Sequence, residues 1–103
     1  MIPAVQHKQP QLAALCRKYG VRRLELFGSA ATGNGFDADQ SDLDFLVEFE
    51  PSDEMGPADQ YFGLWEDLKT LFGRDVDLVS SRSLRNPYFI ESVNATRQTL
   101  YAS

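Results

Sequence analysis

The chain has only one cysteine, Cys16, among its 103 residues, so it cannot form an internal disulfide. Nothing in the cysteine content therefore indicates an oxidising compartment. The sequence also lacks a signal-peptide pattern and any apolar run long enough to cross a membrane, which predicts a cytoplasmic protein without a membrane partner. Its one histidine, His7, lies in an N-terminal segment that we expect to be frayed, and we do not regard it as a base.

Basic residues are also scarce, with 10 Lys and Arg against 15 Asp and Glu, for a net charge of −5. Most of the acids fall in residues 36–77. This distribution argues against a protein that wraps nucleic acid by charge, and we interpret most of these acids as a solvated face. The length of the chain predicts one domain covering residues 1–103.

Periodicity predicts an α/β (α+β) fold, with a mixed sheet of three to four strands and helices packed on it. The expected strands are residues 21–27, 42–50, 75–79 and 98–102, and the expected helices are 9–19, 58–72 and 86–94. The first two strands should be antiparallel, and the helix after the second should cross over to a parallel third strand. Residues 34–41 are expected to form a polar loop.

Three aspartates stand out from this acidic background. Asp42 and Asp44 are two residues apart at the start of a strand, so their side chains should point to the same face. Asp77 on the third strand is expected to join them. Neighbouring carboxylates repel one another unless a cation lies between them, and a divalent metal with hard oxygen ligands fits this need. The alternative is that all three are surface acids at strand ends.

A Gly-Ser pair follows the first strand directly. Gly28 would let backbone N–H groups approach a phosphate, and Ser29 would add a hydroxyl donor. The alternative is that Ser29 only caps the short helical turn after it. A phosphate-binding turn beside a metal site predicts nucleotidyl transfer.

Taken in order, these motifs resemble the minimal nucleotidyltransferases (MNT) of the DNA polymerase β-like superfamily. The resemblance is carried by residues 27–29, 41–47 and 74–79, and it extends over nearly the whole chain. It implies the nucleotidyltransferase fold, with Gly28 and Ser29 binding the triphosphate. It also implies that Asp42, Asp44 and Asp77 are the catalytic metal ligands, holding two Mg²⁺ ions.

The resemblance further implies transfer of AMP from ATP to a hydroxyl of a partner protein. Free-standing members of this size are similar to antitoxins that modify a HEPN-type toxin. The alternative is a rival class, a non-catalytic module that neutralises a toxin by contact alone; the three aspartates favour the enzyme, and the segment after Ser29 favours the rival. The chain departs from the family pattern in two places. The spacing between the Gly-Ser pair and Asp42 is longer than usual, with residues 36–39 as the expected insertion, and no basic residue lies between Ala30 and Gly33.

Overall fold

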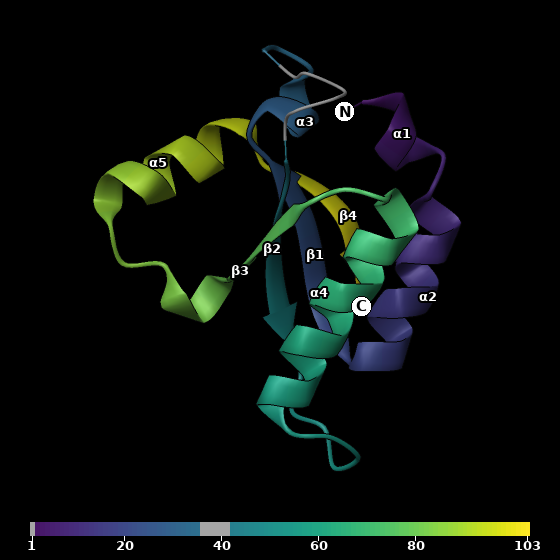
Figure 1. The fold of residues 1–103 in the computed structure, drawn as a ribbon. Helices are drawn as coiled ribbons and strands as arrows, with labels where there is room; N and C mark the ends of the chain where they lie inside the picture. The colour runs from purple at the N-terminus through teal and green to yellow at the C-terminus, as the bar shows by residue number, and fades with distance from the viewer. Residues whose placement is uncertain (1, 36–41) are drawn as a thin grey trace.

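The computed structural model describes residues 2–35 and 42–103 and centres on a four-stranded sheet (Figure 1). β1 pairs antiparallel with β2 and with β4, whereas β2 and β3 run parallel. The strand order β3-β2-β1-β4 confirms the mixed sheet predicted from the sequence. The strands are β1 (Val21–Phe27), β2 (Leu43–Phe49), β3 (Val76–Ser80) and β4 (Gln98–Ala102).

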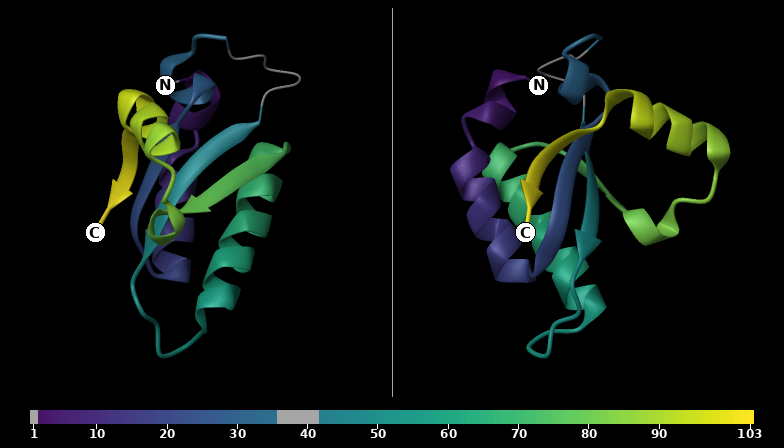
Figure 2. Two further views of the ribbon diagram at one scale, coloured as in Figure 1. Left: turned by 90° about the vertical axis from the view of Figure 1, so that its left-hand side faces the viewer. Right: turned by 180° about the vertical axis from the view of Figure 1, so that it is seen from behind.

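The helices form layers on both faces of this sheet. α2 and α4 cover one face, and α5 lies over the other (Figure 2). The helical segments are α1 (Pro3–Gln6), α2 (Gln9–Tyr19), α3 (Ser29–Thr32), α4 (Pro57–Phe72), the 3₁₀ turn η1 (Ser81–Ser83) and α5 (Pro87–Thr96). None of the helices in residues 2–35 and 42–103 is long and apolar enough to span a membrane.

Strand alternation divides the apolar side chains unequally between the two faces. Leu26 on β1 and Phe45 on β2 are fully buried beneath α2 and α4, with Leu64 and Leu68 of α4 packed against them. The opposite face has a smaller apolar cluster of Phe27, Leu46 and Val93. The face beneath α5 is therefore the one with room for a cleft.

The structure corrects several sequence-based boundaries by one or two residues, and it corrects the N-terminus more substantially. The segment before Gln9 is not frayed, because α1 forms there and the Val5 side chain is fully buried. The Ile2 backbone N–H also donates to the Ala30 carbonyl at 3.1 Å, which ties this segment to α3. Most of the expected polar loop, including the expected insertion at 36–39, lies outside the described residues.

α4 protects the outer edge of the sheet. β3 is an edge strand, so the carbonyl groups of Val76 and Leu78 that point away from β2 need donors from elsewhere. Trp65 Nε1 donates to the Val76 carbonyl at 2.9 Å, and the Tyr61 hydroxyl donates to the Leu78 carbonyl. These two aromatic side chains hold β3 in place beside β2.

A close helix contact at Gly63 provides a test of this packing. An added Cβ at Gly63 would lie 2.4 Å from Tyr19 Cε1 on α2, and Tyr19 is tied to Asp67 by a 2.5 Å hydrogen bond. We expect Gly63→Ala to lower the free energy of unfolding by about 1 kcal/mol, because overpacking outweighs the higher helix propensity of alanine. Urea unfolding would measure the change.

The matched control places the same substitution in a Tyr19→Leu background, where the ring is absent. In that background Gly63→Ala should be neutral or stabilising, because the steric overlap is gone and only the higher helix propensity of alanine affects stability. If Gly63→Ala stabilises the protein with Tyr19 present, close packing does not limit the contact between α2 and α4.

Candidate active site

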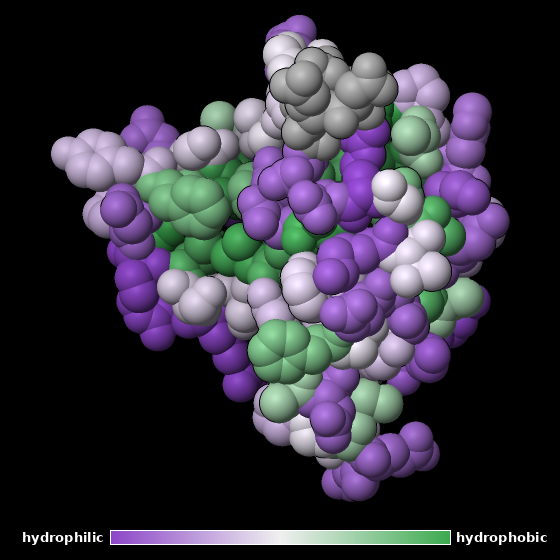
Figure 3. Space-filling model, in the orientation of Figure 1, coloured by the Kyte–Doolittle hydropathy of each residue, from purple (hydrophilic) through white to green (hydrophobic). Residues whose placement is uncertain are grey.

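An open cleft of about 590 Å³ lies between the sheet, α4 and α5. The ends of β1 and β2 contribute Phe27, Gly28 and Asp44, and β3 contributes Asp77. Phe62 of α4 is part of the apolar wall. Figure 3 shows apolar residues gathered below α5, with hydrophilic residues around them. A cleft of this size, with polar groups at one end of an apolar wall, is typical of a small-molecule site.

The strand register brings two of the predicted aspartates together. Asp44 is the residue opposite Asp77 in the parallel β2–β3 pair and opposite Phe27 in the antiparallel β1–β2 pair. Opposed residues on neighbouring strands point to the same face, so both carboxylates face the cleft. Asp42 lies one residue before β2 and is exposed.

The neighbouring carboxylates change the acidity of Asp44. Its pKa is raised from 3.8 to about 6, first by burial, then by the negative charge of Asp77, by a hydrogen bond with Asp77, and by the charge of Asp42. The repulsion between neighbouring carboxylates disfavours the ionised form of Asp44 when no cation is present. Their oxygen atoms are the donor type that a hard divalent cation prefers, so the pair fits Mg²⁺.

The third carboxylate does not complete this pair. Within residues 2–35 and 42–103, no three His, Cys, Asp or Glu side chains are arranged so that together they could hold a metal ion. The structure therefore joins Asp44 with Asp77 but does not assemble the predicted set of three ligands. Asp42 contributes its charge to the field at Asp44 from its exposed position.

Gly28 lies against the Asp44 carboxylate, and its backbone has φ 75° and ψ −155°. An added Cβ would lie 2.7 Å from Asp44 Oδ2, so both the backbone conformation and the space favour glycine. Gly28 is also the N-cap of α3, which makes Ser29 the first helical residue. The alternative prediction, that Ser29 caps this turn, is therefore wrong, because the cap is Gly28. Ser29 is half-buried, next to the lining residue Gly28.

Two contacts at the site were not predicted from the sequence. The Gly28 N–H donates to Thr96 Oγ1 at 2.9 Å, although the two residues are 68 positions apart. Phe89 of α5 packs edge-on against Phe27, with ring centroids 5.8 Å apart. Phe89 falls in the helix predicted at residues 86–94, so the sequence could have indicated an apolar helix face that includes it. No local pattern indicates the role of Thr96.

A family model of the nucleotidyltransferase domain matches residues 10–100. This range includes the cleft-lining residues of β1, β2 and β3. The chain belongs to the nucleotidyltransferase domain family. A protein adenylyltransferase of Thermococcus cleftensis, MntA, is 38% identical over 72 residues, covering 70% of this chain and 68% of the relative.

Solved structures of the family share the fold. The structure of a minimal nucleotidyltransferase is 33% identical, with a TM-score of 0.72 over 91% of this chain and 90% of that chain. A Shewanella oneidensis complex pairs a tri-AMPylated HEPN toxin with its MNT antitoxin. The match is 21% identical, with a TM-score of 0.65, and covers 96% of this chain and 73% of that chain. These likenesses confirm the fold and the family predicted from the sequence.

The raised pKa of Asp44 predicts how stability depends on pH in metal-free protein. Between about pH 4 and pH 6 the folded state binds more protons at Asp44 than the unfolded state, so its contribution makes the free energy of unfolding fall as pH rises. At neutral pH, Asp44→Asn should be more stable than wild type by on the order of 1 kcal/mol, allowing for solvent screening of a half-buried group.

Urea unfolding of both proteins in chelator at several pH values measures this difference. Asp53→Asn, which removes an exposed carboxylate from the connection between β2 and α4, is the control and should follow the wild-type profile. Parallel profiles for wild type and Asp44→Asn across this range would contradict the raised pKa.

The close approach of Gly28 to Asp44 predicts a second difference. Gly33 also has a positive φ of 80° but has nothing within 4 Å of an added Cβ. Gly33→Ala should therefore cost only the backbone strain, about 1–2 kcal/mol. Gly28→Ala should cost more, because it also displaces the Asp44 carboxylate. Equal losses of stability in urea would show that Gly28 is retained for its backbone conformation alone.

Proposed function

We propose that this protein is a Mg²⁺-dependent nucleotidyltransferase that transfers AMP from ATP to a hydroxyl group of a partner protein. The observation that carries the proposal is the Asp44–Asp77 pair, which faces the cleft directly beside Gly28. Membership of the nucleotidyltransferase domain family supports the reaction class. The likeness to MntA, a protein adenylyltransferase, supports AMP as the transferred group and a protein as the acceptor.

The residues of the cleft have separate roles in this proposal. Asp44 and Asp77 would hold Mg²⁺, and Asp42 would be the third carboxylate ligand. When bound, two Mg²⁺ ions neutralise charge on the triphosphate and on the departing pyrophosphate. Gly28, which has no side chain, lets the backbone of the turn approach the phosphates, and the Ser29 hydroxyl donates a hydrogen bond to a non-bridging phosphate oxygen.

We propose a HEPN-type toxin as the acceptor, which would make this protein the antitoxin of the pair. The Shewanella oneidensis complex supports this assignment through its shared fold. Exposed aromatic side chains at the cleft support a protein acceptor as well. Phe62 is 57% exposed and Phe89 is 38% exposed, and both line the cleft. Exposed apolar side chains of this kind are enriched in protein interfaces.

Neutralisation of a toxin by contact alone is the second candidate function. It is favoured by the absence of an assembled group of three carboxylates in the described residues. The neutral segment after Ser29 also favours it, although Ala30 and Ala31 are fully buried and could not carry a charge there. Thr32 and Gly33 are the exposed positions of that segment.

Transfer can be tested with ATP labelled at the α-phosphate, Mg²⁺ and, as candidate acceptor, the product of the neighbouring gene. Wild type should label the partner, and Asp44→Asn should abolish labelling while keeping the fold, because it removes one charge from the metal ligands. Asp53→Asn, an exposed change outside the cleft, should label at the wild-type rate.

The same variants separate the two candidate functions. Normal labelling by Asp44→Asn would contradict the proposed role of this carboxylate. If Asp44→Asn binds the toxin and neutralises it without labelling it, neutralisation by contact alone is the better description.

A further inference from the structure

The hydroxyl group of Thr96 is directed at the turn that we assign to phosphate binding. Thr96 is the last residue of α5, and its Oγ1 lies 2.9 Å from the Gly28 backbone nitrogen, from which it accepts. Thr96 Oγ1 also lies 3.3 Å from the Ser92 carbonyl oxygen, to which it donates. A hydroxyl has one proton and two lone pairs, so donation to Ser92 leaves a lone pair facing Gly28.

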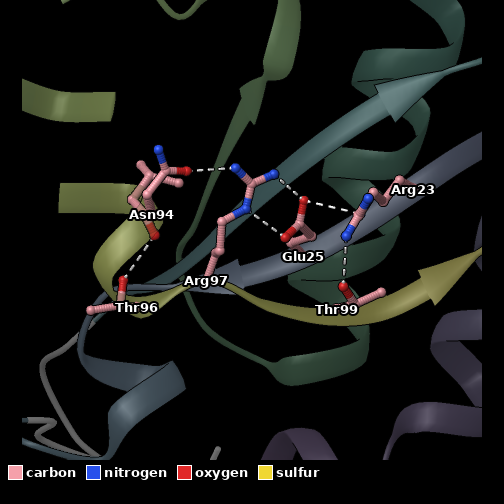
Figure 4. Close-up of polar contacts among 7 residues, drawn as sticks. Arg23, Glu25, Asn94, Thr96, Arg97 and Thr99 are labelled. Carbon is pink, nitrogen blue, oxygen red and sulfur yellow. Dashed lines mark hydrogen bonds and ion pairs between the residues drawn. The ribbon is translucent and has the colours of Figure 1, made fainter. Parts of the chain in front are cut away.

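The residue after Thr96 anchors this end of α5 to β1 (Figure 4). Arg97 Nε donates to Glu25 Oε2 at 2.8 Å and Nη2 donates to Oε1 at 2.5 Å, so the pair is bidentate. The Glu25 side chain is only 4% exposed. Arg23 forms a second ion pair with it, with Arg23 Nε 3.2 Å from Glu25 Oε1. The hydrogen bonds from Arg97 lower the pKa of Glu25, which keeps this buried carboxylate charged.

Arg97 also braces its own helix. Its Nη1 donates to Asn94 Oδ1 at 2.7 Å, so one guanidinium group joins the last turn of α5 to Glu25 in β1. Glu25 is three residues before Gly28 on the same chain segment. Thr96 is therefore fixed relative to the end of β1 by a charged, partly buried contact, and a bidentate pair of this kind has a well-defined geometry.

The effect of this contact extends to the carboxylate pair. The Gly28 backbone is so close to Asp44 that an added Cβ would lie 2.7 Å from Oδ2. A change in the Gly28 peptide would therefore move the turn relative to Asp44. The Thr96 hydroxyl accepts from the Gly28 N–H, before the Gly28 Cα, and the Ala31 N–H of α3 donates to the Gly28 carbonyl, after it, at 3.1 Å.

We propose that Thr96 is a positioning residue, whose hydroxyl sets the Gly28–Ser29 turn against Asp44 for the bound triphosphate, with the Arg97–Glu25 pair fixing Thr96 in place. This inference depends on the proposed function for its nucleotide. It assigns Thr96 no contact with the reacting atoms, and its effect is on the affinity for ATP rather than on the acceptor.

Thr96→Val tests the inference, because valine keeps the side-chain shape and removes the acceptor. Thr96→Ser keeps the hydroxyl and should rescue the loss. Thr70→Val is the matched control, because Thr70 is also a helical threonine whose hydroxyl donates to the carbonyl four residues earlier, Glu66 at 3.1 Å, but it lies on α4 and does not line the cleft.

Two measurements are needed. The first is hydrogen exchange of the Gly28 amide, which should become roughly tenfold faster in Thr96→Val because the Thr96 acceptor is lost. The second is the Kd for ATP with Mg²⁺, which should rise roughly threefold to tenfold. In transfer assays the same loss should appear in KM for ATP, with kcat and KM for the acceptor little changed.

Faster Gly28 exchange and weaker ATP binding in Thr96→Val, both restored in Thr96→Ser and absent in Thr70→Val, would support the inference. Unchanged Gly28 exchange, or an ATP affinity equal to that of Thr70→Val, would overturn it. If wild type binds ATP but labels no protein, the proposed function fails on its own, and the ATP affinity of Thr96→Val still decides the role of Thr96.

Discussion

The candidate site depends on the parallel register between β2 and β3. This register sets Asp44 opposite Asp77 and directs both carboxylates to the face below α5. A slip of one residue would place an apolar residue of β3, Val76 or Leu78, opposite Asp44 and turn Asp77 toward α4. Among the strands of residues 2–35 and 42–103, β3 has one neighbour, β2, so the hydrogen bonds from Tyr61 and Trp65 to its outer carbonyl groups help to keep that register.

The same register works against stability where it brings like charges together. Burial and the neighbouring charge of Asp77 raise the pKa of Asp44, which means that the ionised form is disfavoured in the metal-free fold. The apolar face beneath α2 and α4 offsets this cost, since Leu26, Phe45 and Leu64 are fully buried there. The face of the sheet beneath α2 and α4 thus stabilises the fold, whereas the face beneath α5 has the two carboxylates of the candidate site.

The C-terminal segment completes the site on the face of the sheet opposite α2 and α4. α5 brings Phe89 to Phe27, and β4 then pairs with β1. Between them lie Thr96 and Arg97, which contact Gly28 and Glu25 respectively. The last part of the chain therefore completes a turn formed near its beginning. This makes the Gly28–Ser29 turn sensitive to a residue that no local motif contains.

Local physics determined much of this protein from the sequence alone. Alternation along the second strand predicted the buried face of Phe45 and the opposite face of Asp44, and the apolar stripe of α4 predicted the crossover to a parallel strand. The tertiary structure alone decided the pairing of Thr96 with Gly28, the exposed position of Asp42, and the burial of Asp44 that is the first cause of its raised pKa. These depend on distances and burial between segments far apart in the chain, and periodicity within one segment contains no information about either.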